Sequence, residues 1–99
     1  MLVEFEDDDL RQLYEEADFK PPGFGAELIR AFRKVVGLVY AATDERDLRA
    51  LRSLRFEKLQ GQRLNQYSMR LHRGSRLIFR LETPQEGKIV VIVEIVDYH

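Results

Sequence analysis

Hydrophobic residues recur every three or four positions in the first half of the chain and every second position in the second half. The first spacing is typical of helices that bury one face, and the second is typical of strands that do so. We therefore expect an α+β fold, in which N-terminal helices pack on one face of a small, mainly antiparallel β-sheet. A chain of 99 residues suits a single domain, 1–99, with one hydrophobic core.

A short strand and a first helix are expected before residue 20. The segment LVEF (2–5) favours a strand, and the acidic run Asp7–Asp9 offers N-caps and favourable charges to the helix that follows. The prolines and glycines of FKPPGFG (19–25) end this helix. Its apolar positions are Leu10, Leu13, Tyr14 and Ala17.

The second helix carries the longest apolar stripe of the chain. The stripe consists of Leu28, Ile29, Phe32, Val35, Val36, Val39 and Tyr40. A short third helix follows, in which Thr43 or Asp44 is the N-cap and Leu48 and Leu51 are expected to point inward.

Alternation begins near residue 55 and predicts the last three strands. In QYSMRLH (66–72), apolar and polar residues alternate, and RGS (73–75) forms a turn. In RLIFRL (76–81), the positions of Leu77, Phe79 and Leu81 alternate with those of Arg76, Ile78 and Arg80. The turn TPQEG (83–87) then leads into KIVVIVEIVDYH (88–99), so the three strands form an antiparallel meander. We expect the helices to cover one face and four cationic or titratable side chains to lie on the other, namely Arg70, His72, Arg76 and Arg80.

Charge is distributed unevenly along the chain. Residues 1–45 contain 5 Lys/Arg and 11 Asp/Glu, whereas residues 46–99 contain 11 Lys/Arg and 6 Asp/Glu. This asymmetry is typical of proteins that bind a polyanion, although the arginines can also serve only to solvate a helix and two strands. The free face of the sheet is expected to lack acids as far as Glu82, so its cations repel one another unless an anion lies among them.

Several classes of site are excluded or disfavoured. The chain has no cysteine, which excludes disulfides, thiolate catalysis and cysteine-based zinc sites. With two histidines and many arginines, we expect no metal site. The longest apolar stretch, IVVIV (89–93), is too short to span a bilayer and the N-terminus lacks a basic region, so we expect a cytoplasmic protein without membrane contact.

The C-terminal residues Asp97, Tyr98 and His99 are the strongest candidates for chemistry. Asp97 and His99 share the parity of a strand, so both side chains are expected on one face. An imidazole exchanges protons near neutral pH, which suits general acid–base catalysis, although a frayed terminus is the alternative. Phosphodiester cleavage in RNA needs a base, an acid and a cation for the charge that develops on phosphate, and arginine suits the last task.

The stretch FEKLQGQRLNQYSMRLHRGSRLIFRL (56–81), followed by VEIVDYH (93–99), resembles the RelE/ParE superfamily of toxin–antitoxin toxins, and most of all its HigB-like branch. The resemblance rests on an ordered combination that covers roughly residues 24–99. It consists of Leu-x-Gly-x-Arg (59–63), Tyr-Ser-x-Arg (67–70), Arg76 before an apolar-aromatic strand, and Asp-Tyr-His (97–99).

This resemblance implies a ribosome-dependent endoribonuclease that cuts mRNA in the decoding site by metal-free attack of the 2′-hydroxyl, without a cofactor. It also implies a cognate antitoxin, usually of the helix-turn-helix type, and contact with operator DNA only through that antitoxin. By analogy, Arg76 stabilises the scissile phosphate, Asp97 and His99 transfer protons, and Tyr98 orients the substrate. The expected RNA contacts are Lys58, Arg63, Arg70, His72 and Arg73.

Three positions depart from the family pattern and leave the extent of activity open. Glu57 and Gln60 stand where some HigB toxins have His and Lys, and Ser75 stands where many have an aromatic residue. Lys58 shares the parity of Gln60 and is expected to reach the same face. The alternatives are a ParE-like DNA gyrase poison and a noncatalytic relative that binds RNA or antitoxin. The acidic EFEDDD (4–9) is read either as a solvated helix start or as a surface for a basic antitoxin.

Overall fold

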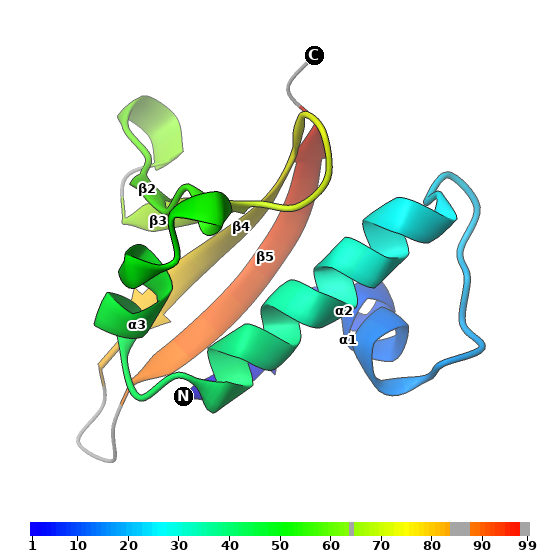
Figure 1. Cartoon of the computed structure of the whole chain (residues 1–99), viewed down its shortest axis with the longest axis horizontal. Helices are drawn as coiled ribbons and strands as arrows, with labels where there is room; N and C mark the ends of the chain where they lie inside the picture. Colours follow the sequence, from blue (N-terminus) through cyan, green and yellow to red (C-terminus); the bar gives the residue numbers. More distant parts are fainter. Residues whose placement is uncertain (64, 84–87, 98–99) are drawn as a thin grey trace.

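The computed structural model describes residues 1–63, 65–83 and 88–97. Helices and a mixed sheet make up the chain in the expected order, and the α+β class is confirmed (Figure 1). The helical elements are α1 (Asp8–Glu15), α2 (Ala26–Ala41), α3 (Glu45–Ala50) and the 3₁₀ turns η1 (Arg52–Leu54) and η2 (Gly61–Arg63). The strands are β1 (Leu2–Phe5), β2 (Glu57–Lys58), β3 (Gln66–Arg70), β4 (Ser75–Glu82) and β5 (Ile89–Asp97).

The sheet has the order β1-β5-β4-β3-β2. The meander β3–β4–β5 is antiparallel, as the alternation predicted, and β2 adds to it antiparallel. β1 was expected as a short strand with no partner assigned, and it pairs in parallel with β5, with Leu2 opposite Ile89. The first and last strands are therefore neighbours, and β5 lies inside the sheet.

Polar side chains form hydrogen bonds to the backbone at both ends of helix α1. The Asp7 carboxylate accepts hydrogen bonds from the backbone N–H groups of Asp9 and Leu10, which confirms the predicted N-cap. At the other end, the guanidinium of Arg33 on α2 donates to the carbonyls of Leu13 at 2.9 Å and of Ala17 at 3.1 Å. A cation thus satisfies carbonyls at the C-terminal end of α1, where the helix dipole favours positive charge.

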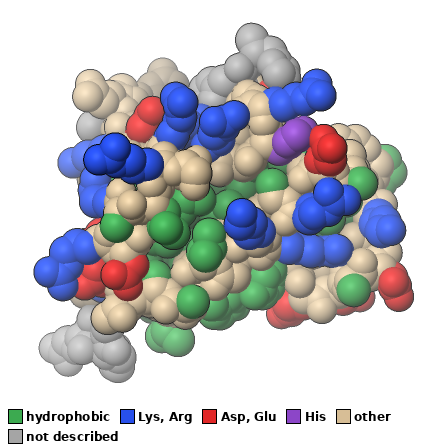
Figure 2. All heavy atoms as spheres, viewed as in Figure 1, with side chains coloured by type: hydrophobic (Ala, Val, Ile, Leu, Met, Phe, Trp, Pro, Cys, Tyr) green, Lys and Arg blue, Asp and Glu red, His purple; other side chains and the backbone are tan. Residues whose placement is uncertain are grey.

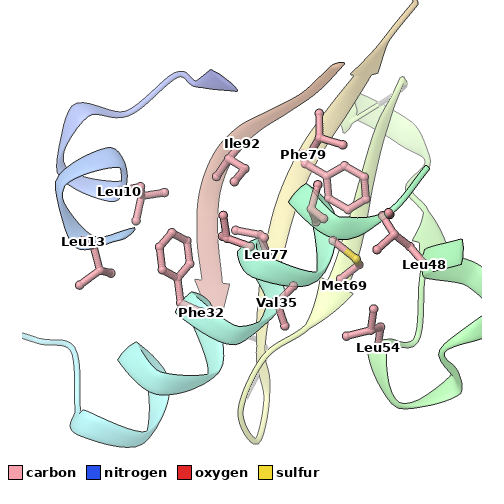
Figure 3. Packing of buried hydrophobic residues seen from close by; sticks show 14 of the residues in the cluster. Leu10, Leu13, Phe32, Val35, Leu48, Leu54, Met69, Leu77, Phe79 and Ile92 are labelled. Atoms are coloured by element: carbon pink, nitrogen blue, oxygen red, sulfur yellow. The ribbon is translucent and has the colours of Figure 1, made fainter. Parts of the chain in front are cut away.

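The core lies between the helices and one face of the sheet (Figure 3). Phe32 of α2, Leu77 and Phe79 of β4 are fully buried there. Three residues of the predicted stripes are exposed instead. Ala17 lies beyond the end of α1, and Leu51 is 42% exposed because it is the C-cap of α3. Tyr40 is 45% exposed, and its ring stacks on Tyr14 with 5.4 Å between centroids.

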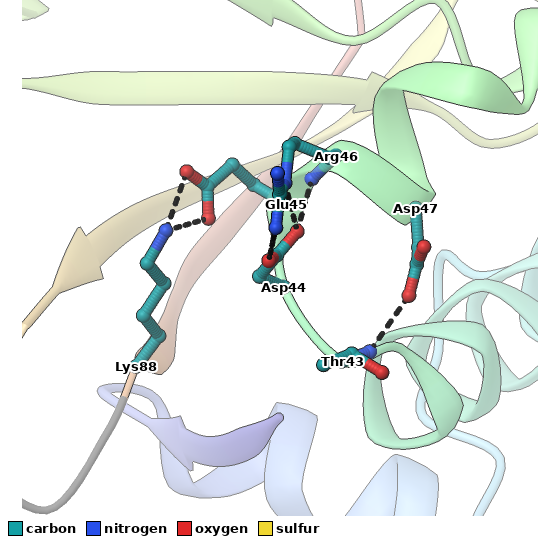
Figure 4. Close-up of polar contacts among 6 residues, drawn as sticks. All are labelled: Thr43, Asp44, Glu45, Arg46, Asp47 and Lys88. Atoms are coloured by element: carbon teal, nitrogen blue, oxygen red, sulfur yellow. Dashed lines mark hydrogen bonds and ion pairs between the residues drawn. The ribbon is translucent and has the colours of Figure 1, made fainter.

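Helix α3 is held by local polar contacts (Figure 4). Asp44 is its N-cap and accepts a hydrogen bond from the backbone N–H of Arg46 at 2.9 Å, while the Arg46 side chain pairs with the same carboxylate. Lys88 at the start of β5 donates to Glu45 at 2.6 Å. The Lys88–Glu45 contact attaches α3 to the segment that leads into β5.

Candidate nucleic-acid interface

Four arginines line one pocket of about 330 Å³ at the β3–β4 end of the sheet. They come from the C-cap of η1 (Arg55), the end of β3 (Arg70), the following turn (Arg73) and β4 (Arg76), and Gly74 completes the lining. No carboxylate lines this four-arginine pocket among the described residues. Guanidinium groups stay charged at any physiological pH, so the pocket suits a multiply bonded anion such as a phosphate.

The protein fixes Arg76 in a single orientation. Its side chain is 14% exposed, and its Nε donates to Ser68 Oγ at 2.8 Å. Its Nη2 donates to the carbonyl of Arg55 and, at 3.5 Å, to that of Ser68. Because these acceptors are already in place, the guanidinium needs little reorganisation to meet a ligand, which is the property of an electrostatic stabiliser.

Glu57, which motif reasoning treated only as a departure from the family, places its carboxylate beside this guanidinium. Its Oε2 lies 3.9 Å from Arg76 Nη2. Glu57 pairs with Ser68 across β2 and β3, so its side chain lies on the face of Arg76, and Glu57, Leu59, Ser68 and Arg76 line a common pocket. The available sequence signal was that Glu57 is one of only two acids in residues 46–80.

Two residues of the four-arginine pocket have strained backbones. Arg55 has φ 45° and Arg73 has φ 52°, in the left-handed region that non-glycine residues rarely adopt. Such conformations often cluster at functional sites, since the surrounding fold must maintain them. Here both strained arginines direct their charge to the same pocket.

The expected row of cations on the free face is only partly correct. His72 lies beyond the end of β3, in the turn closed by the Ser75 N–H to His72 carbonyl bond, and its Nε2 is 2.9 Å from Glu27 on α2. The prediction that His72 shares the face of Arg76 is therefore wrong. Strand β3 ends at Arg70, whereas the sequence pattern predicted that the alternation continues to His72.

The prediction that this face lacks acids as far as Glu82 is also wrong, because Glu57 lies on it, and Glu94 adds an acid beyond Glu82. Glu94 pairs across the strands with Ile78 and binds Arg63 at 3.0 Å, and Arg63 also donates to Gln66 at 2.9 Å. Arg80 pairs with Glu6 and, at 3.4 Å, with Glu82, and the hydrogen bond to Glu6 raises the pKa of Arg80. The protein's own carboxylates neutralise these cations, so the positive charge is concentrated in the four-arginine pocket.

Strand register decides where the remaining candidates lie. Lys58 is exposed on β2 and pairs with Tyr67, so its side chain projects from the face opposite to that of Glu57 and Ser68. Asp97 pairs with Ser75, whereas Arg76 pairs with Val96, so Asp97 and Arg76 belong to opposite faces at the end of the sheet. Tyr98 and His99 lie outside the described residues.

Comparison with known proteins decides the family. The family described as "RelE-like toxin of type II toxin-antitoxin system HigB" matches residues 3–99. The chain belongs to this family of HigB-like toxins. A YoeB/ParE toxin from Agrobacterium tumefaciens has a similar structure, with 12% identity, full coverage of both chains and a TM-score of 0.56, which shows the shared fold. No curated protein matches the sequence.

As a type II toxin, this HigB-like protein has a cognate antitoxin as its partner. In the part of the toxin that the structure describes, no helix is long and apolar enough to cross a membrane. The same residues contain no group of three or more metal-ligating side chains. The described site brings together arginines, the hydroxyl of Ser68 and the carboxylate of Glu57.

Proposed function

We propose that this HigB-like toxin is a ribosome-dependent endoribonuclease that cleaves mRNA in the decoding site. The observation that carries the proposal is the orientation of Arg76 by Ser68 and the Arg55 carbonyl, inside a pocket that three further arginines line. Such an arrangement favours the pentacoordinate phosphate of the transition state, whose negative charge exceeds that of the diester. Family membership supports the same reaction.

In the proposed mechanism, Glu57 accepts the proton of the ribose 2′-hydroxyl. Its carboxylate lies close to Arg76 on the same face, whereas Asp97 belongs to the opposite face, so we assign the base to Glu57. The 2′-oxygen attacks phosphorus, the bond to the 5′-oxygen breaks, and that oxygen takes up a proton. His99 is the proposed donor, with Tyr98 orienting the nucleotide; the products are a 2′,3′-cyclic phosphate and a 5′-hydroxyl.

The partners follow from the same proposal. Translating ribosomes present the mRNA, and Arg63, Arg70 and Arg73 are proposed contacts to RNA. The cognate antitoxin is proposed to be a helix-turn-helix protein that alone contacts operator DNA. Copurification with this antitoxin, followed by operator binding with and without the toxin, tests the assignment.

Cleavage on translating ribosomes tests the mechanism directly. We expect R76A to slow cleavage by about 10²–10³-fold through loss of charge stabilisation, and E57Q to slow it by about 10²-fold or more through loss of the base. Primer extension locates the cuts, and selective labelling of 5′-hydroxyl ends identifies the product. R46A is the matched control, because Arg46 is an exposed arginine of α3 whose partner is Asp44.

Full cleavage by both R76A and E57Q contradicts this mechanism. Gyrase-dependent DNA breaks without mRNA cleavage would instead favour the ParE-like alternative. A wild type that is harmless on expression would favour the noncatalytic one.

A further inference from the structure

A second pocket, which we call the helix-side pocket, lies directly beside the four-arginine pocket. It has a volume of about 290 Å³, and α2, η1 and the end of β3 with its following loop form its walls. Arg70 and Arg73 line both pockets, so the two are continuous around the β3–β4 loop. Figure 2 shows apolar side chains reaching the surface in the middle of this side of the molecule, with Lys and Arg side chains around them.

The lining of the helix-side pocket combines an apolar floor with a cationic rim. The floor consists of Val35, Leu38, Leu54 and Leu71. Lys34 of α2 adds a third cation to Arg70 and Arg73, and no carboxylate lines this pocket among the described residues. A ligand that fits must therefore present a flat or apolar body next to an anion.

We propose that the helix-side pocket binds the base of the nucleotide adjacent to the cleaved linkage, while Arg70 and Arg73 hold the phosphate between the two pockets. The inference rests on the proposed nuclease function and deepens it by assigning a base-binding subsite. Single-stranded RNA can splay its bases away from the backbone, and proteins bind them by stacking and by arginine contacts beside the phosphates. Ser53, also in the lining, is a polar group available to base edges, whereas the Nε2 of His72 is already paired with Glu27.

Continuity with the four-arginine pocket favours RNA over a peptide as the occupant. A peptide side chain needs only the apolar floor, whereas a nucleotide uses the floor and the shared arginines together. Loss of one base contact of this kind typically weakens binding by about 5- to 100-fold. Because a pocket of about 290 Å³ also limits the size of the base that enters, the subsite is expected to set which nucleotide flanks the cut.

Filling the pocket from two walls tests this assignment. Ala31 is a half-buried residue of α2 and Ser53 is an exposed residue of η1, and both line the pocket. We expect A31F and S53F each to change the nucleotide preference at one position beside the cut by at least about 5-fold. The control is A26F, the same change at an exposed position of α2 that lines a different pocket with Phe24 and Ile29.

Sequencing of 5′ ends from mRNA on translating ribosomes gives the readout, with thermal unfolding to verify that each variant folds. A shift at the same position in A31F and S53F, absent in A26F, supports the subsite. Cleavage by both variants with the wild-type distribution of sites overturns it, as does loss of antitoxin inhibition alone, which would assign the pocket to the antitoxin. No cleavage by the wild type overturns the proposed function itself, so the two failures are distinguishable.

Discussion

At the residue scale, the buried hydroxyl of Ser68 decides how Arg76 is held. Ser68 is fully buried on the face opposite the main core, and its Oγ accepts the Nε–H of Arg76. A buried polar group without a partner costs about 1–3 kcal/mol. Orientation of the guanidinium and stability of the sheet are therefore linked at this one side chain.

Replacement of Ser68 by alanine should reduce both properties. We expect S68A to lower the free energy of unfolding by about 1–2 kcal/mol, because Arg76 Nε loses its acceptor in a site with little access to water. Cleavage should slow as well, since the guanidinium is no longer fixed. Urea unfolding and cleavage on ribosomes measure the two effects, and S53A, at an exposed serine of η1, should leave stability within about 0.5 kcal/mol of the wild type. Unchanged stability in S68A would argue against the link.

The left-handed conformations of Arg55 and Arg73 predict opposite effects on stability and activity. Glycine adopts positive φ without steric cost, so R55G and R73G should raise the free energy of unfolding by up to about 1 kcal/mol while slowing cleavage through loss of a cation. Chemical unfolding and cleavage assays test the pair. The control is R70G, which removes a cation of the same pocket from an ordinary strand position and should lower stability instead.

At the element scale, Arg33 of α2 links α2 to α1 by donating hydrogen bonds to backbone carbonyls at the C-terminal end of α1. We expect R33A to lower the free energy of unfolding by about 2 kcal/mol, because the carbonyls at the end of α1 lose a charged donor. Hydrogen exchange should show faster opening of α1 than of α2. R30A, an exposed arginine on the same helix, should have little effect. Equal destabilisation by both variants would refute a capping role.

The N-cap of α3 predicts that the stability of the folded protein falls at low pH. Hydrogen bonds from Arg46 lower the pKa of Asp44 to about 2, and the hydrogen bond from Lys88 lowers that of Glu45. A carboxyl whose pKa is lower in the folded state contributes stability above its unfolded pKa near 4, and this contribution is lost as pH falls toward 2. D44N keeps a side chain that can cap but cannot titrate, so its stability should fall less than that of the wild type between pH 5 and pH 2 in thermal unfolding. Parallel curves for the two proteins would contradict this origin.

Local patterns predicted the helices and strands well. They failed for side chains whose position depends on a residue far away in the sequence. The stripe of α2 was confirmed from Ile29 to Val39. The strand β4 was also confirmed, but it buries Leu77, Ile78 and Phe79 in succession, so its burial does not alternate as expected. The ring of Tyr40 stacks on that of Tyr14, and the orientation of His72 depends on Glu27. Such side chains are placed by tertiary contact, which periodicity does not contain.

At the scale of the whole molecule, the positive residues of the second half converge although the sequence scatters them. Arg55 and Arg76 lie 21 positions apart and still meet, because Arg76 donates to the Arg55 carbonyl. Charge counts indicated a polyanion partner, but they did not identify which cations remain after pairing. The carboxylates Glu6, Glu82 and Glu94 pair with other cations. Of these, only Glu82 lies on the same strand as its arginine, so the pattern of one strand could not reveal the pairs with Glu6 and Glu94.

Association with the ribosome should depend strongly on salt for this reason. Each phosphate contact to a single strand contributes about −0.7 to the slope of log K against log salt concentration, so R73Q should make the slope shallower by about 0.7–1. Binding to ribosomes at several salt concentrations measures this slope. R46Q, on α3 and outside the four-arginine pocket, should retain the wild-type slope; equal changes in both variants would show that only the total charge matters.

The central position of β5 has a consequence for biosynthesis. β5 comes after β1, β2, β3 and β4 along the chain, yet in the sheet it lies between β1 and β4 and bonds to both. While the protein is being translated, β1 cannot pair until β5 has been synthesised, and pairings between distant segments form slowly. The ribosome that makes this toxin therefore carries an unfinished sheet, and the proposed nuclease activity begins only after that ribosome has read the codons of β5.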